Sequence, residues 1–195
     1  MLKCAQLMAF VAVVSASFAL GAPGFGAECL NVKVPDSVKA GGTDLVLNGL
    51  GIRKATFLNV KVYVAGLYLP QKSGDAGKII GTSQPWQLVL RFVRDVDASD
   101  MRDAWEEGFK KNSGDKLAAL QPRIETLKAR MADFKEGQYL AFTEDPAKGV
   151  AVDVNGASGG AIEGPDFANA LLSIWLGREP PNDDLKSGLL GGKCK

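Results

Sequence analysis

The order of predicted elements indicates an α+β protein with a mainly antiparallel sheet. Strand patterns come first, then helical patterns, then strands again, and finally two short helical segments. Neighbouring strand patterns are joined by hairpin-like turns, and the strand–helix–strand alternation that builds parallel sheets does not occur. With 195 residues, of which 46% are hydrophobic, the chain can bury the core of one domain.

Two strands within Leu45–Pro70 form the centre of the expected fold, after a short strand at Asn31–Pro35. They are expected to meet near a glycine-rich bend. In the second strand, alternation predicts that Val62 and Val64 face the core. The opposite face combines an amine and a phenol with apolar side chains, which suits the wall of a partly apolar cavity. That face carries Lys61, Tyr63, Ala65, Leu67 and Leu69.

A strand that begins after Pro85 is apolar on both faces, which predicts a central position in the sheet. The period then changes to that of a helix. We interpret the apolar stripe of this helix as core rather than as a platform for a ligand. The stripe consists of Met101, Ala104, Trp105, Gly108 and Phe109.

Strands return at Tyr139–Thr143 and Val150–Val154. Asn155-Gly156 is a strong hairpin signal and leads into Ala157–Ile162. The glycines of this last strand predict an edge position, or a site where another group approaches the backbone closely. Two helices are expected to complete the chain; Pro165 suits the first turn of the first of them.

The first segment is typical of a secretory signal. Lys3 precedes an apolar run at Leu7–Leu20, and small residues follow at Gly21–Ala27. The run is short for a membrane span, so we expect cleavage near Ala27 rather than an uncleaved anchor. The expected organisation is a signal peptide at residues 1–27 and one exported domain at residues 28–195, in a bacterial periplasm and with no stable membrane span.

Cys29 and Cys194 stay in the mature chain, one near each end, whereas Cys4 leaves with the signal. In an oxidising compartment two such cysteines usually pair, which predicts a disulfide between the ends of the domain. The alternative is two free thiols on mobile tails.

Composition excludes several function classes. The formal net charge is +1, which does not indicate nucleic-acid binding. The chain has no histidine, so it lacks the usual proton shuttle, the commonest metal ligand and any Ser-His-Asp triad. We therefore predict no metal site and no cofactor.

Several motifs, in this order and spacing, resemble the chalcone isomerase family, and most of all its bacterial chalcone isomerase-like members. They are Gly-x-Gly-x-Arg at Gly49–Arg53, Ala-Gly-Leu-Tyr-Leu at residues 65–69, FKEGQYLAFTEDP at Phe134–Pro146 and SIWLG at residues 173–177. The resemblance implies an open-faced β-sandwich, in which helices pack on one face of a large, mainly antiparallel sheet. It also implies a ligand cleft between the sheet and the helices.

Plant chalcone isomerases hold their substrate with an arginine, a threonine, a tyrosine–asparagine pair and a hydroxyl on the late helix. By resemblance, Arg53 matches the arginine, Tyr63 stands in the place of the threonine, and Ser173 corresponds to the late hydroxyl. The tyrosine–asparagine pair is missing, since its places hold Asp100 or Met101 and Glu107 or Gly108. Most donors for a developing enolate are therefore absent.

The related plastid fatty-acid-binding proteins hold a carboxylate with an arginine and a tyrosine, and Arg53 and Tyr63 match this pair in residue type. We therefore expect an exported, non-catalytic protein that binds a small amphipathic carboxylate, with Arg53, Tyr63 and Ser173 at the site. Two alternatives stay open: an intramolecular lyase acting on an enone or phenolic substrate, and an interaction module without a ligand. Arg53 could instead pair with a carboxylate such as Asp44, and Tyr63 could be a core tyrosine.

Overall fold

The computed structural model describes residues 25–56 and 58–195. Residues 1–24 of the expected signal peptide lie outside the described residues, so cleavage near Ala27 stays a prediction. Among the helices of the described residues, none has the length and apolar character needed to span a membrane.

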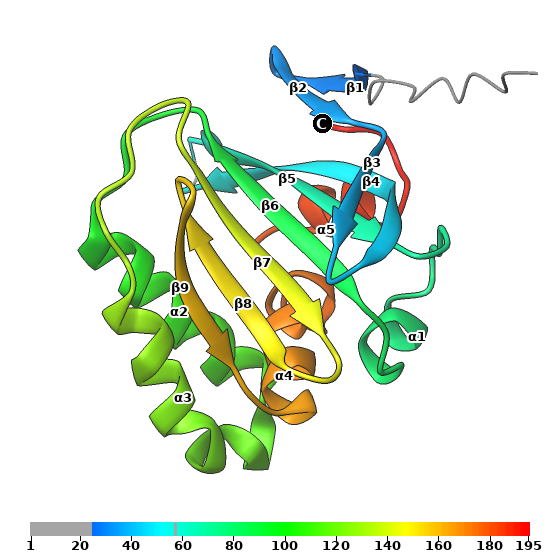
Figure 1. Cartoon of the computed structure of the whole chain (residues 1–195). Coiled ribbons are helices and arrows are strands. Elements are labelled where there is room, and N and C mark those ends of the chain that lie inside the picture. Colours follow the sequence, from blue (N-terminus) through cyan, green and yellow to red (C-terminus); the bar gives the residue numbers. More distant parts are fainter. Residues whose placement is uncertain (1–24, 57) are drawn as a thin grey trace, which may run out of the picture.

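The fold is built on one large antiparallel sheet whose seven strands follow one another in chain order (Figure 1). The strands are β3 (Ser37–Ala40), β4 (Thr43–Ala55), β5 (Val60–Leu69), β6 (Trp86–Phe92), β7 (Tyr139–Asp145), β8 (Gly149–Val154) and β9 (Ala157–Ile162). A separate hairpin consists of β1 (Phe25–Cys29) and β2 (Val32–Pro35). The predicted α+β class is confirmed, as are the central place of β6 and the edge position of β9.

The helices are α1 (Ala76–Gly81), α2 (Ala98–Asn112), α3 (Leu117–Ala129), α4 (Pro165–Leu176) and α5 (Asp183–Leu189). In Figure 1, α4 and α5 are seen behind the strands of the sheet. Apolar side chains from the helices and from this face of the sheet form the larger hydrophobic core. The sequence did not predict α1, whose first turn is capped by the Asp75 carboxylate accepting from the Lys78 N–H.

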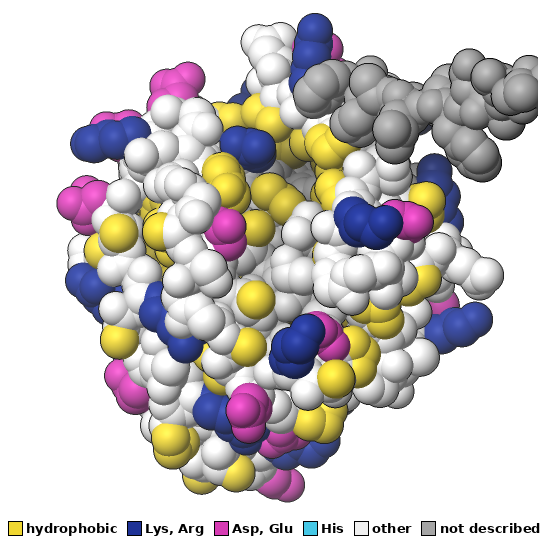
Figure 2. All heavy atoms as spheres, viewed as in Figure 1, with side chains coloured by type: hydrophobic (Ala, Val, Ile, Leu, Met, Phe, Trp, Pro, Cys, Tyr) yellow, Lys and Arg dark blue, Asp and Glu magenta, His cyan; other side chains and the backbone are white. Residues whose placement is uncertain are grey.

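The opposite face of the sheet carries a smaller apolar cluster, which β1 and β2 help to cover. Val38, Val89 and Val93 pack at the margin of this cluster and are only half-buried. In the space-filling view, apolar side chains accordingly show at the surface below the hairpin (Figure 2). Helices thus cover one face of the sheet, and the other face is partly open.

The expected glycine-rich bend is wrong, because the segment between β4 and β5 contains no glycine. Gly49 and Gly51 lie inside β4, on the strand that carries Arg53. A side chain on Gly49 would overlap the backbone oxygen of Gly188, and one on Gly51 would overlap that of Leu185. The two glycines therefore let α5 lie directly on β4. The chain reverses further on, in the segment between β4 and β5.

The expected common face of Val62 and Val64 is also wrong. Val64 belongs to the smaller cluster, whereas Val62 packs against the larger core. The cause is a bulge: Arg53 pairs with Tyr63 and the next residue pairs with Lys61, so Val62 has no partner on β4. An extra residue of this kind changes which face the following side chains occupy.

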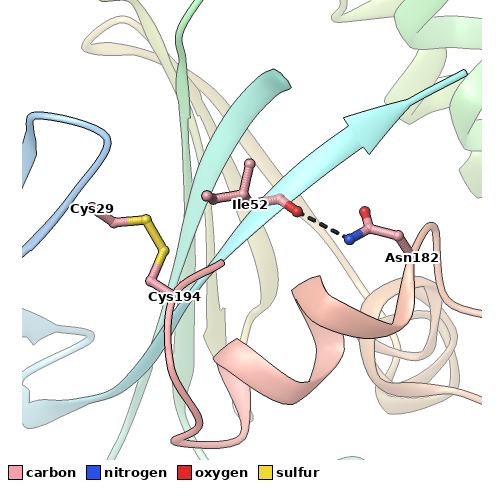
Figure 3. The surroundings of a disulfide bond; sticks show 4 residues. All are labelled: Cys29, Ile52, Asn182 and Cys194. Carbon is pink, nitrogen blue, oxygen red and sulfur yellow. Dashed lines mark hydrogen bonds between the residues drawn. A yellow bond between two sulfur atoms is a disulfide. The ribbon is translucent and has the colours of Figure 1, made fainter. Parts of the chain in front are cut away.

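Cys29 and Cys194 form a disulfide with a Cα–Cα distance of 6.1 Å, which confirms the predicted pairing (Figure 3). The bond joins the end of β1 to the tail that follows α5, so the C-terminus lies beside the β1–β2 hairpin (Figure 1). The alternative of two free thiols is wrong.

Candidate ligand-binding site

A cavity of about 680 Å³ opens where β4 and β5 meet the helices. Its walls come from the adjoining ends of β4 and β5, the loop at residues 94–96, one face of α2, Ile174 of α4, and residues 179–182 between α4 and α5. The volume lies within the range of about 300–1,000 Å³ that is typical of small-molecule sites.

Arg53 lies in the wall of this cavity and is half-buried. Its Nη1 donates to the backbone oxygen of Pro181 at 3.1 Å and to that of Lys54. Among the described residues no carboxylate lies within ion-pair distance of the guanidinium, and Asp44 lies 3.7 Å from Lys39 instead. The alternative of an Arg53–Asp44 pair is therefore wrong. The guanidinium keeps donors that a ligand can use.

Tyr63 lies directly opposite Arg53 in the register of β4 and β5, so both side chains share one face of the sheet. Tyr63 is only 7% exposed and lines the cavity. Its hydroxyl accepts a hydrogen bond from the Trp175 Nε1–H at 3.1 Å. Burial raises the pKa of Tyr63, and the Trp175 hydrogen bond and the Arg53 charge oppose this only in part. The phenol therefore stays protonated, and no acceptor for its O–H is found in the part of the chain that the structure describes.

The structure does not bring Ser173 to the other two expected residues. Ser173 is half-buried, and its Oγ donates to the backbone oxygen of Asn169 at 2.7 Å, within α4. The following residue, Ile174, lines the cavity in its place.

The apolar stripe of α2 belongs to the site as well as to the core, whereas the sequence pattern indicated the core alone. Met101, Trp105 and Phe109 are buried as expected. Four residues of the stripe also line the cavity: Met101, Ala104, Trp105 and Gly108. The small residues of the stripe were the available sequence signal for this close packing. A Cβ atom on Gly108 would lie only 2.8 Å from Ile174 Cγ2. Glycine there lets α2 pack closely on α4.

Residues 179–182 form one wall of the cavity, and hydrogen bonds to β4, far away in the sequence, hold this wall in place. The Asn182 side chain donates to the backbone oxygen of Ile52 at 3.1 Å (Figure 3). It also accepts from the Lys54 N–H at 3.1 Å. These bonds hold the wall against β4 beside Arg53. No pattern in the sequence indicated this contact.

The wall contains three other cations: Arg94 is exposed, and the two lysines are paired with carboxylates. Lys54 contacts Asp184 at 2.9 Å, and Lys111 contacts Glu107 at 2.5 Å. The Lys111 ammonium is the main cause of the lowered pKa of Glu107. Arg53 differs from both lysines because only backbone oxygens contact it. Within residues 25–56 and 58–195, no group of three metal-ligating side chains is found.

A model of the chalcone isomerase-like family matches residues 26–191. The chain therefore belongs to the chalcone isomerase-like family, as the motifs predicted. The crystal structure of a fatty-acid binding protein from Arabidopsis thaliana has a similar fold, with a TM-score of 0.61 over 83% of this chain and 92% of that chain. The two sequences are 19% identical, so this likeness concerns the fold. No curated protein matches the sequence significantly.

Proposed function

We propose that this protein binds a small amphipathic carboxylate, such as a fatty acid, and does not convert it. Arg53 is the anchor for the carboxylate and Tyr63 is a second donor beside it. The observation that carries the proposal is a half-buried guanidinium without a carboxylate partner among the described residues, in the wall of a cavity of about 680 Å³.

The chemistry of the walls supports this ligand class. A guanidinium can grip a carboxylate with two parallel hydrogen bonds, and a protonated phenol adds a third. Val60, Val62, Met101 and Ile174 give the cavity apolar surface for a hydrocarbon chain. Each buried methylene contributes about 0.8 kcal/mol to binding. The fold is shared with a protein named as a fatty-acid binding protein, which supports the same class.

The lyase alternative receives less support. The positions that would hold the tyrosine–asparagine pair do line the cavity, but they are Asp100, Met101, Glu107 and Gly108. Carboxylates do not stabilise a developing enolate, which needs donors.

We also propose that the protein is exported to a periplasm, since a disulfide between its ends is compatible with an oxidising compartment.

Native mass spectrometry of detergent-free protein with added lauric acid tests the proposal. We expect a one-to-one complex, and we expect Arg53→Ala to weaken it at least tenfold. Arg91→Ala is the matched control, because Arg91 lies on β6 of the same sheet, stacks over the Tyr139 ring at 4.6 Å and does not line the cavity.

Equal binding by wild type and Arg53→Ala would contradict the role of Arg53. Loss of the chalcone absorbance band on mixing with a chalcone would favour the lyase. If neither acid nor chalcone is bound or converted, the interaction module is the remaining function.

A further inference from the structure

Trp105 lines the cavity, yet its indole nitrogen has no hydrogen-bond partner. The side chain is 3% exposed, and no acceptor for its Nε1–H is found among the described residues. Two other buried side-chain atoms in this part of the chain also lack a partner, Ser113 Oγ and Glu144 Oε2, but neither residue lines the cavity.

The neighbouring Trp175, in contrast, has a hydrogen-bond acceptor for its indole N–H. The ring centroids of Trp105 and Trp175 are 5.6 Å apart, and the Trp175 N–H donates to Tyr63. Buried indole N–H groups usually have an acceptor, because a buried donor without one loses its hydrogen bonds to water and gains none in return. Trp105 is therefore a buried donor without an acceptor, and it belongs to a residue that borders the cavity.

We propose that Trp105 is a ligand-binding residue whose indole N–H donates to a head-group oxygen of the bound acid. This inference rests on the proposed function and extends it. A guanidinium, a phenol and an indole present donors to the head group, and the one phenolic acceptor is already used by Trp175. Such a site selects an ionised carboxylate over an alcohol of the same chain length.

A competing role for the same N–H comes from the core. The Trp105 ring meets the Phe142 ring edge to face, with centroids 5.6 Å apart and planes at 87°. In that role the N–H points at an aromatic face and takes no part in binding. The two roles differ in whether the N–H responds to a ligand.

The test uses the full-length protein labelled with ¹⁵N, in which the three tryptophans give three indole N–H signals. Trp86→Phe and Trp175→Phe assign the Trp105 signal by elimination, so the assignment does not need a Trp105 variant. Lauric acid and 1-dodecanol are then titrated separately. We expect lauric acid to move the Trp105 signal downfield and to leave the Trp86 signal in place, because Trp86 does not line the cavity.

Affinity gives the second measurement. Trp105→Phe should weaken the binding of lauric acid about tenfold, as expected for a hydrogen bond to a charged group, and should change the binding of 1-dodecanol less. The inference is overturned if the wild-type Trp105 signal stays fixed at saturating lauric acid, or if Trp105→Phe binds the acid as tightly as wild type. In both cases the proposed function stands, since wild type still binds the acid. If wild type itself binds no acid, the proposed function fails together with this inference.

Discussion

On β5, Tyr63 and Tyr68 are both buried, but they face opposite sides of the sheet. Tyr68 is 1% exposed, and its hydroxyl donates to the backbone oxygen of Pro35 at 3.1 Å. Burial raises the pKa of Tyr68 to about 12. Tyr63 is buried almost as fully, but within the described residues its O–H has no acceptor. Burial is thus similar at the two sites, and the two tyrosines differ in whether a group of the protein accepts the hydroxyl proton.

The surroundings of the two tyrosines differ in the same way. On the Tyr68 side, β1 and β2 cover the sheet and the Cys29–Cys194 disulfide fastens them to the C-terminal tail. On the Tyr63 side, the helices leave a cavity with Arg53 in its wall. We therefore expect changes on the hairpin side to affect stability and changes at the cavity to affect binding.

The largest expected effect comes from removing the disulfide. Cys29→Ser combined with Cys194→Ser should lower the free energy of unfolding by about 4 kcal/mol, since the bond closes a loop of 165 residues in the unfolded chain. Urea unfolding of the oxidised wild type and the double variant measures the difference. Binding of lauric acid should be unchanged wherever the variant is still folded.

Reduced wild type is the control for this prediction, because it loses the bond without any substitution. A stability change below about 1 kcal/mol would show that the chain ends are held by packing alone. A loss of binding as large as that of Arg53→Ala would show that the two sides of the sheet are coupled.

The sequence predicted well the features that depend on local patterns. The order of strands and helices, the central place of β6 and the hairpin after β8 all follow from periodicity and turn residues. Alternation failed at Val62 because a bulge depends on the partner strand. The role of Gly49 and Gly51 could not be predicted, since α5, which they accommodate, lies more than a hundred residues away in the chain.

The site was predictable in part for the same reasons. Arg53 and Tyr63 were found through the family motif, and strand register brings them together. Asp44 could not pair with Arg53, because nine residues of extended strand β4 separate their Cα atoms by roughly 30 Å. The prediction of Ser173 was one residue away from Ile174, which lines the cavity. Neighbouring positions of a helix point about 100° apart, so this offset turns the side chain away. The wall made by Asn182 depends on a contact across 130 residues, which no local pattern records.

Glu144 gives a second, smaller test of the comparison. It lies on the helix-covered face of β7, opposite Trp86 in the register and away from the cavity, and it is 4% exposed. Burial raises the pKa of Glu144 from 4.5 to about 7, and the Asp145 charge adds to the shift. Between these two values the unfolded chain loses the proton while the folded protein keeps it. Stability is therefore full below about pH 4.5 and falls as the pH rises through 7.

We expect the free energy of unfolding to fall by on the order of 2 kcal/mol between pH 5 and pH 8, and Glu144→Gln to remove this fall. Urea midpoints at the two pH values measure it. Asp166, whose pKa Arg123 lowers to about 2, acts only in more acidic solution. A wild-type midpoint that does not change with pH would contradict the prediction. Glu144→Gln should not change the binding of lauric acid, because Glu144 does not line the cavity. Weaker binding by this variant would show that a buried group outside the cavity also controls affinity. The expected separation between stability and binding would then be wrong.

The smallest expected effects come from the two tyrosines themselves, and they are the most direct test of the comparison. Tyr63→Phe leaves the Trp175 N–H without its acceptor, and Tyr68→Phe leaves the Pro35 oxygen without its donor, so each should lower the free energy of unfolding by about 1 kcal/mol. Because the stability costs match, each variant controls for the other in a titration with lauric acid. Only Tyr63→Phe should weaken binding, about fivefold to tenfold, since only that hydroxyl has a proton to give to the ligand. Equal affinities for both variants would make Tyr63 a core tyrosine like Tyr68, and the head-group site would then depend on Arg53 without a phenolic donor.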